Sequence, residues 1–544
     1  MIPVIEALLP LFVGAPLLVG GAFFVAPAHH RLRQVLGAAS LVALLVGAVV
    51  LVVITADGTV LAHQVALWPG GIAIPFVADA FSSLLLLVTA ILSTVTFGHL
   101  ITSGEARSPS IASFVLVLAG GVAGALLTAD LFNLFVFIEV MLLPSYGLLV
   151  ILSRRGDLGG SRLYVTVNLL ASTLFLAGVG LIYAVQGTVN LAELAGAGDD
   201  PATAIAAAVC LSAIAVKAAV FPAHGWLART YGAASPAVAA LFSGLHTKVA
   251  VYIIFRISAV IFEGDPAWMT PIIIVATITL LVGALTSLGE SEMRPLLVFQ
   301  MVSGIGFILV GVAVFTPAGL AAGVVYMVHH MIVMGSLLLI AGAIEQTYGS
   351  GHLSRVSGLR TREPLLTAVF VVGALSLAGL PPFSGFVAKY ALVQATAEGG
   401  QVLVAGLLIV ASLLALVAMM KIWAEMFNGK RHADVELLAA EARIRERHAL
   451  LDDQPVDADA VAEEAALAVE RHEPPRGAET AADDDDPHEH RGTRVPVRLL
   501  VPSLVLAAIS VGLGLGAEGL LQLAEQAAAG LVDINDYVRA VIDR

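Results

Sequence analysis

The sequence predicts an all-α polytopic membrane protein with about 14 transmembrane helices. Three observations support this fold class. Hydrophobic residues make up 58% of the 544 residues, which is too much for a surface that faces water. They occur in stretches of about 20, the length of a helix that crosses the hydrocarbon layer. Charged residues are only 13% of the chain and lie mainly between these stretches.

The expected spans follow one another along the whole chain. In order, they lie near residues 3–26, 33–55, 77–101, 110–128, 131–152, 163–186, 204–229, 236–261, 268–288, 295–315, 318–344, 365–397, 401–427 and 496–523. The first is expected to be retained as a span, because no basic segment precedes it and no small-residue cleavage site follows it.

The charges of the connecting loops predict the orientation. Alternate connections contain Lys or Arg, namely Arg31, Arg33, Arg107, Arg154, Arg155, Arg162, Arg229, Arg294, Arg355, Arg360, Arg362, Lys430 and Arg431. The other connections contain acids and no Lys or Arg. We call the two ends of the protein the basic side and the acidic side. The positive-inside rule predicts that the basic side is cytoplasmic and that both termini are outside.

Two segments are expected to differ from the membrane bundle. Residues 428–495 are an acidic insertion with little apolar surface, so a partly disordered cytoplasmic segment is expected. Its histidines His472, His488 and His490 could bind a metal ion, but a solvated acidic linker is the favoured interpretation. Residues 496–544 contain the last span and an amphipathic tail, expected at the outer surface or against a partner.

Prolines interrupt two of the spans in a similar way. Pro222 follows Lys217 in the seventh span, and Pro381 and Pro382 precede Lys389 in the twelfth. A proline frees a backbone carbonyl, which in lipid is tolerated only where protein or water satisfies it. The chain is therefore divided into a three-helix segment (1–109), a five-helix repeat (110–261), an inverted five-helix repeat (268–427), the insertion and the C-terminal segment. Paired broken helices in an inverted repeat indicate an ion pathway between them.

Ionisable side chains inside the spans are the main functional signal. They include Glu139, Lys217, Lys248 and Lys389. Each charge at this depth costs at least roughly 2.5–3.5 kcal/mol, so it needs a partner, water or a function. Burial favours a neutral lysine and a nearby carboxylate favours a charged one, so movement of Glu139 relative to Lys217 would hold or release a proton. The alternative is a static ion pair that fixes helix packing.

Further polar residues extend this group. Lys248 lies 12 residues after Pro236 and so about 18 Å along its helix, near the membrane centre. His329 and His330 point about 100° apart, so one of them is expected to face the pathway; for each, packing and proton relay are equally good interpretations. Lys389 is expected to be either a terminal proton site or an anchor for carbonyls of the break.

Other charged residues near the span ends have simpler interpretations. Arg256 and Lys421 are expected to extend to the membrane interface, and Asp79 to cap a helix. No nucleophile–base motif, phosphate loop or metal-ligand spacing occurs, so no catalytic residue, metal site or cofactor is predicted. The single cysteine, Cys210, excludes thiolate-ligated clusters within this chain, and the net charge of −13 argues against nucleic-acid binding.

Four motifs together resemble a known family. They are the stretches Leu131–Val140, Lys217–Pro222, Ser235–Val249 and Leu377–Lys389. They resemble the antiporter-like subunits shared by respiratory complex I, membrane-bound hydrogenases and Mrp-type multisubunit sodium/proton antiporters, and most of all the D subunits of the Mrp type. Ala228 stands where a proline is common, and the acidic insertion is long for this group.

The resemblance implies roles and partners. Glu139 and Lys217 would be the switching pair, Lys248 with His329 or His330 the central relay, and Lys389 the terminal site. The implied protein is a proton-translocating subunit of an antiporter in a bacterial cell membrane, working with a larger homologous A subunit and small membrane subunits and exchanging protons for sodium. The alternatives are a pump subunit of a quinone-linked or hydrogenase-type oxidoreductase and a scaffold that only packs other subunits.

Overall fold

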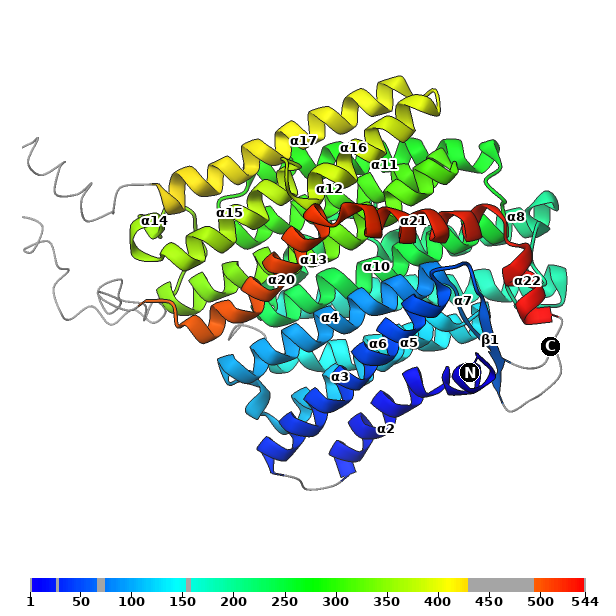
Figure 1. Ribbon diagram of the computed structural model, residues 1–544, viewed down its shortest axis with the longest axis horizontal. Coiled ribbons are helices and arrows are strands. Elements are labelled where there is room, and N and C mark those ends of the chain that lie inside the picture. Colours follow the sequence, from blue (N-terminus) through cyan, green and yellow to red (C-terminus); the bar gives the residue numbers. More distant parts are fainter. Residues whose placement is uncertain (1, 26–28, 66–73, 153–157, 429–493, 543–544) are drawn as a thin grey trace, which may run out of the picture.

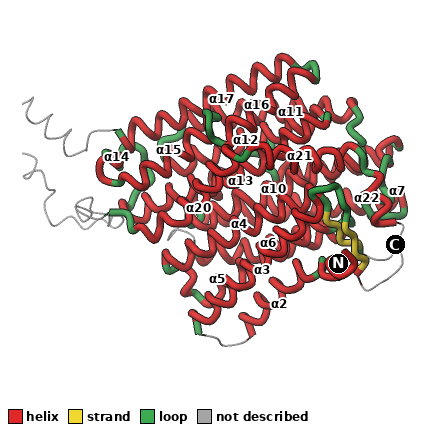
Figure 2. Tube along the Cα trace, in the orientation of Figure 1, coloured by secondary structure: helices red, strands yellow, loops and turns green. Residues whose placement is uncertain are grey.

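The protein is a bundle of long helices. The computed structural model describes residues 2–25, 29–65, 74–152, 158–428 and 494–542. Most helices run along the long axis of the molecule, so their connections gather at its two ends (Figure 1). The described residues form one small sheet, which lies at the end that also holds both termini (Figure 2).

The N-terminal segment contains three crossing elements. They are α1 (Ile2–Leu8) with α2 (Leu11–Val25), α3 (His30–Thr55) and α4 (Ala80–Ser103). Between α3 and α4, strands β1 (Leu61–Gln64) and β2 (Pro75–Ala78) pair in antiparallel fashion. Asp79 caps α4 as expected, because its carboxylate accepts a hydrogen bond from the Ser82 backbone N–H and Ser82 Oγ accepts one from Asp79 N.

Two units of five crossing elements follow. The first contains α5 (Pro109–Leu127), α6 (Leu131–Ile151), α7 (Leu158–Gln186), α8 (Pro201–Lys217) with α9 (Gly225–Ala233), and α10 (Pro236–Val260). The second contains α11 (Pro266–Gly289), α12 (Met293–Val314), α13 (Pro317–Tyr348), α15 (Pro364–Ala378) with α16 (Ser384–Glu398), and α17 (Val402–Ile422) with a π-helical turn at Trp423–Phe427. Short helices η2 (Glu105–Arg107), η3 (Ala197–Asp199) and α14 (Leu359–Arg362) lie in connections. Because five crossings are an odd number, the second unit is inverted relative to the first.

The predicted number of spans is confirmed. In the described part of the chain, 12 helical segments are long and apolar enough to cross a membrane. The α8/α9 and α15/α16 pairs supply the two interrupted crossings. The interruptions fall at the predicted prolines, and the Phe221–Pro222 and Pro381–Pro382 peptide bonds are cis. Most of the predicted insertion, residues 429–493, lies outside the described residues, as do His472, His488 and His490.

The C-terminal segment differs from the prediction. The expected single span 496–523 consists of α20 (Val497–Leu515) and α21 (Ala517–Val532), which meet at Gly516, and α22 (Asn535–Ile542) follows. Helix α21 packs against α4 and α13, and α22 packs against the β hairpin. The tail therefore lies against its own chain, because Leu520, Ala524, Ala527 and Leu531 bury one face of α21.

Three helices form the centre of the bundle. In the most apolar stretch of α10 and of α13, 100% of the residues are buried, and in that of α12, 94% are. In the stretch formed by α1 and α2 only 28% are buried. Helices α2, α3, α7 and α17 expose apolar side chains at the rim, which suits contact with lipid. Polar groups on α10, α12 and α13 are therefore shielded from lipid by the surrounding helices.

Candidate functional site

The two helix breaks position two of the predicted lysines. Lys217 is the last residue of α8, and its Nζ donates a hydrogen bond of 3.2 Å to the backbone oxygen of Asn168 in α7. Lys389 lies in the second turn of α16, and its Nζ donates one of 3.2 Å to the oxygen of Ala378, the last residue of α15. Lys389 Nζ also lies 4.9 Å from the centre of the Phe307 ring. Lys389 thus makes the carbonyl contact that the anchor interpretation requires, and this contact leaves a proton-site role open.

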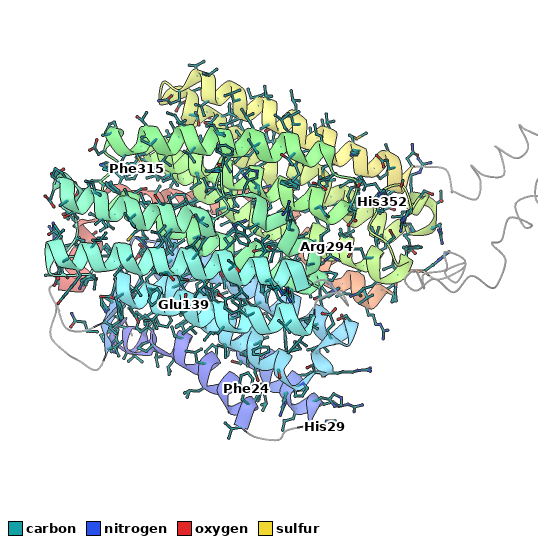
Figure 3. All side chains as sticks on the ribbon, turned by 180° about the vertical axis from the view of Figure 1, so that it is seen from behind. Phe24, His29, Glu139, Arg294, Phe315 and His352 are labelled. Atoms are coloured by element: carbon teal, nitrogen blue, oxygen red, sulfur yellow. The ribbon has the colours of Figure 1, made fainter. Side chains whose placement is uncertain are left out.

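Glu139 lies near Lys217 without touching it. Glu139 is half-buried on α6 and its charge acts on Lys217, yet the two side chains form no direct ion pair. Glu139 Oε1 is buried and, among the described residues, accepts no hydrogen bond. The static ion pair offered as an alternative is therefore not formed in this conformation. Figure 3 shows Glu139 in the body of the bundle, away from His29 and His352 at its edges.

His246 lies near Lys217, and the sequence analysis missed it. It is buried on α10, two residues before Lys248. Its Nε2 lies 2.8 Å from Ser145 Oγ of α6 and its Nδ1 lies 3.4 Å from Tyr164 Oη of α7. The Lys217 charge also acts on this ring. A histidine within a helix that is otherwise mostly apolar was the available signal.

Lys248 and the two histidines of α13 occupy the centre of the bundle. Lys248 is 2% exposed, and its Nζ donates a hydrogen bond of 3.3 Å to Thr247 Oγ1. His329 and His330 are both fully buried. The charges of Lys248 and Lys389 both act on His330, which stacks on Tyr326. His330 therefore lies within electrostatic reach of both lysines.

His329 belongs to a hydroxyl cluster at the second break. Its Nδ1 lies 2.8 Å from Ser384 Oγ, the first residue of α16. Ser384 Oγ lies 2.9 Å from Ser510 Oγ of α20, which lies 3.0 Å from Ser376 Oγ of α15. This contact positions His329 beside the break, while the Lys389 charge acts on it as well. His329 thus has a hydroxyl partner, whereas His330 lies against Gly304 and the Tyr326 ring, and which of the two faces a pathway stays a prediction.

Comparisons with known proteins decide the family. Residues 128–415 match the family described as "NADH:quinone oxidoreductase/Mrp antiporter, TM". The D subunit of a Na(+)/H(+) antiporter from Alkalihalophilus pseudofirmus is 35% identical over 431 residues, which cover 78% of this chain and 87% of the relative. The chain belongs to this NADH:quinone oxidoreductase/Mrp antiporter family.

Other relatives of the antiporter family agree. The D subunit of a Na(+)/H(+) antiporter from Bacillus subtilis is 36% identical over 370 residues, which cover 67% of this chain and 75% of the relative. A chain of the Mrp complex from a Dietzia species is 43% identical, with a TM-score of 0.85 and 99% of each chain covered. A chain of an archaeal membrane-bound sulfane sulfur reductase, 22% identical with a TM-score of 0.79 over 98% of this chain and 99% of its own length, shares the fold. All six predicted pathway residues fall inside the region that matches the antiporter family.

A buried ion pair on the basic side escaped the sequence analysis. Arg294, expected in a loop, is 1% exposed at the start of α12 and forms an ion pair with Glu345 near the end of α13. It also donates hydrogen bonds to the backbone oxygens of Gly232, near the end of α9, and of Ala234, which follows α9. Figure 3 shows Arg294 at the end of α12 nearer to His352, opposite Phe315. Helix α12 begins at Met293, before the start of the expected span 295–315, so Arg294 lies within the packed helices and not in a loop.

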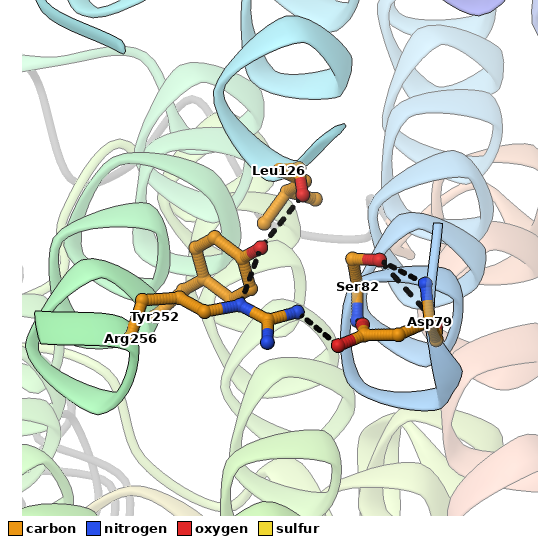
Figure 4. Close-up of polar contacts among 5 residues, drawn as sticks. All are labelled: Asp79, Ser82, Leu126, Tyr252 and Arg256. Atoms are coloured by element: carbon orange, nitrogen blue, oxygen red, sulfur yellow. Dashed lines mark hydrogen bonds and ion pairs between the residues drawn. The ribbon is translucent and has the colours of Figure 1, made fainter. Parts of the chain in front are cut away.

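Arg256 is also buried, which corrects the prediction that it extends to the interface. Its side chain is 4% exposed and its Nη2 lies 2.5 Å from Asp79 Oδ2 (Figure 4). Arg256 Nε donates a hydrogen bond to Tyr252 Oη, which donates one of 2.7 Å to the Leu126 oxygen. The Tyr537 ring of α22 lies 5.0 Å away on the same guanidinium. The tail thus covers the acidic-side end of α10. The Arg256 guanidinium is paired with Asp79, 177 residues away in the sequence, and not with water at the membrane interface.

Lys421 has a related arrangement at the basic side. Its Nζ donates hydrogen bonds of 2.9 Å and 2.7 Å to the oxygens of Leu288 and Glu290 at the end of α11. A cation is favourable at a helix C-terminus, where backbone carbonyls lack partners. Lys421 therefore holds α17 to α11, besides lying near the end of its span as predicted.

Proposed function

We propose that this chain is the proton-translocating subunit of a multisubunit Na+/H+ antiporter. The observation that carries the proposal is the row of ionisable groups across the bundle, from Glu139 on α6 and Lys217 on α8 through Lys248 on α10 to Lys389 on α16. Such residues are rare in membrane interiors and mark ion pathways or proton relays. The D subunits among its relatives, which belong to Na(+)/H(+) antiporters, support the same assignment. We propose transport and not catalysis as the activity.

The proposed mechanism uses the contacts around each lysine. Lys217 Nζ holds its proton more strongly when the Glu139 carboxylate is near. Movement of α6 relative to α8 changes the distance between the two groups, so Lys217 holds or releases the proton. His246, held by Ser145 and Tyr164, passes protons between Lys217 and Lys248. His330 continues the path to Lys389, while His329 orients the second break through Ser384. The hydrogen bond from Lys389 to the Ala378 oxygen weakens when Lys389 loses its proton, because it is no longer charge-assisted.

The test measures sodium-dependent collapse of a pH gradient in inverted vesicles that contain the whole complex. Wild type is expected to dissipate the gradient on addition of sodium. Lys217→Ala and Glu139→Ala are expected to lose at least 90% of this rate, about tenfold or roughly 1.4 kcal/mol, with normal assembly. Lys421→Ala is the matched control, because among the described residues its ammonium group donates hydrogen bonds to the end of α11, away from the predicted pathway. Retained transport in Lys217→Ala would overturn the proposal.

A second candidate is a proton-pumping subunit of a complex I-like or hydrogenase-type oxidoreductase, because the matching family description includes NADH:quinone oxidoreductase subunits. The same vesicles distinguish the two. If sodium has no effect but an electron donor drives proton pumping, the second candidate is correct. If Glu139 and Lys217 can both be replaced without loss of either activity, the chain is a scaffold.

The proposal includes partners and location. We propose a hetero-oligomer with a larger homologous A subunit and small membrane subunits; the likeness to a chain of the Mrp complex from a Dietzia species supports an assembly of several subunits. Sodium is the proposed counter-ion, and no cofactor is proposed. The location is a bacterial cell membrane, with both termini outside and residues 428–495 in the cytoplasm. We retain the division into 1–109, 110–261, 268–427, 428–495 and 496–544 as the working domain boundaries.

A further inference from the structure

The basic-side half of α4 contains buried polar side chains that the site above does not use. His99, Ser93 and Thr96 are all fully buried. Within the described residues, Ser93 Oγ and Thr96 Oγ1 make no hydrogen bond, and the His99 ring makes no well-aligned one, although the Leu499 backbone of α20 lies close to it. A buried polar group left without a partner costs about 1–3 kcal/mol. Groups of this kind normally bind ordered water, so a hydrated strip along α4 is expected.

Two of these side chains face the centre of the bundle. Leu92, Thr96 and His99 are spaced i, i+4 and i+7, which places them on one stripe of the helix. Leu92 fills the space left by two glycines: a Cβ at Gly244 of α10 would overlap Leu92 Cδ1, and one at Gly335 of α13 would lie 2.9 Å from Leu92 Cδ2. The stripe therefore points toward the junction of α10 and α13.

Helix α20 covers the same place from another direction. The ring of His99 lies beside the backbone of Leu499 in α20. One turn further along, Ser503 Oγ is also buried without a hydrogen bond in the described residues. The Ser503 oxygen accepts a hydrogen bond of 2.9 Å from Ser336 Oγ of α13. Polar groups of α4, α13 and α20 thus lie together between the basic side and the central lysine.

The stripe leads toward Lys248. Helix α4 ends on the basic side at Ser103, so His99 lies within about 6 Å of that end along the axis. Leu92 lies about 10 Å deeper along the same helix. Helix α10 begins on the basic side, so Lys248 lies one turn, about 5–6 Å, deeper than Gly244. The apolar side chain of Leu92 at the level of Gly244 therefore separates the polar stripe from Lys248.

We infer that His99 is a proton-relay residue of a branch that joins the basic side to Lys248, with Leu92 as its apolar barrier. This inference rests on the proposed function and adds an entrance to it. A neutral imidazole accepts a proton on one ring nitrogen and releases one from the other, so its charge is restored after each transfer. Thr96 and water carry the proton from His99 to the level of Leu92. Movement of the Leu92 side chain out of the space beside Gly244 and Gly335 then opens the way to Lys248.

The test uses the whole complex in inverted vesicles and the rate of sodium-dependent proton movement. His99→Gln retains a polar side chain of similar size but cannot carry a proton, so at least a tenfold lower rate is expected. Thr96→Val conserves shape and removes the hydroxyl, so about a threefold loss is expected. His63→Gln on β1, at the opposite end of the molecule, is the matched control and is expected to have the wild-type rate. Added imidazole is expected to restore part of the rate of His99→Ala.

The outcomes are distinct. Wild-type rates in both His99→Gln and Thr96→Val would overturn the inference. So would a loss in His99→Ala that imidazole does not restore and that matches a loss of assembled complex, because His99 would then only support packing. A wild type without sodium-dependent proton movement, or an active Lys217→Ala, would instead overturn the proposed function and the inference with it.

Discussion

At the scale of single residues, the buried pair of Arg294 and Glu345 makes a strong prediction about stability. Arg294→Met conserves most of the side-chain volume but leaves the Glu345 carboxylate buried without its cation. Breaking a buried pair from one side typically costs about 3–5 kcal/mol. We expect a clearly lower melting temperature of the purified complex. Arg360→Met in the exposed part of α14 is the control and should change stability by no more than about 0.5 kcal/mol. Equal melting temperatures for the two variants would contradict the prediction.

Glu105 predicts a pH dependence on the basic side, outside the spans. Burial raises the pKa of the Glu105 carboxyl, although a hydrogen bond from Ser235 and the charge of Arg294 oppose the shift. Because the folded pKa lies above the unfolded value, the stability from this group is complete below the unfolded pKa and is lost as the pH rises through the folded pKa. Glu105→Gln should therefore melt higher than wild type at pH 8, and the difference should disappear near pH 4. A constant difference at all pH values would contradict this assignment.

At the scale of helices, close packing at the second break can be tested with glycine substitutions. A Cβ at Gly385 of α16 would overlap the backbone oxygen of Ser376 in α15, and that oxygen cannot move away as a flexible side chain would. We expect Gly385→Ala to separate α15 from α16, to cost about 1–3 kcal/mol or more and to lower transport. Gly406→Ala in α17 meets no atom within 4 Å and should be neutral or slightly stabilising. Stable, active Gly385→Ala complex would show that the break is loosely packed.

The helices themselves were largely predictable from the sequence, and the polar contacts between them were not. Hydropathy located every crossing element, because a span needs about 20 apolar residues wherever it packs. Arg256 and Arg294 were placed wrongly because their partners, Asp79 and Glu345, lie far away in the sequence, and only folding shows that they meet. His246 was missed because nothing in its own helix distinguishes a packing histidine from one that bonds to Ser145 on another helix.

At the scale of the whole molecule, the C-terminal tail links the rim of the bundle to its centre. Helix α21 lies along α4 and α13, and α22 lies beside the β hairpin (Figure 1). The Tyr537 ring of α22 lies over the Arg256 guanidinium. The acidic-side end of α10 is therefore closed by residues from both ends of the chain. Hydropathy could not predict this, because an amphipathic helix packs equally well on its own chain, on a partner or on a membrane surface.

The single cysteine makes the orientation of the whole molecule directly testable. Cys210 is fully buried, so a membrane-impermeant maleimide should leave the wild type unlabelled in intact vesicles. Arg360→Cys adds an exposed thiol on the basic side, and Ala202→Cys adds one at the start of α8 on the acidic side. The positive-inside rule predicts labelling of Arg360→Cys only in inverted vesicles and of Ala202→Cys only in right-side-out vesicles. The reverse pattern would place both termini in the cytoplasm, and the branch through His99 would then open to the outside.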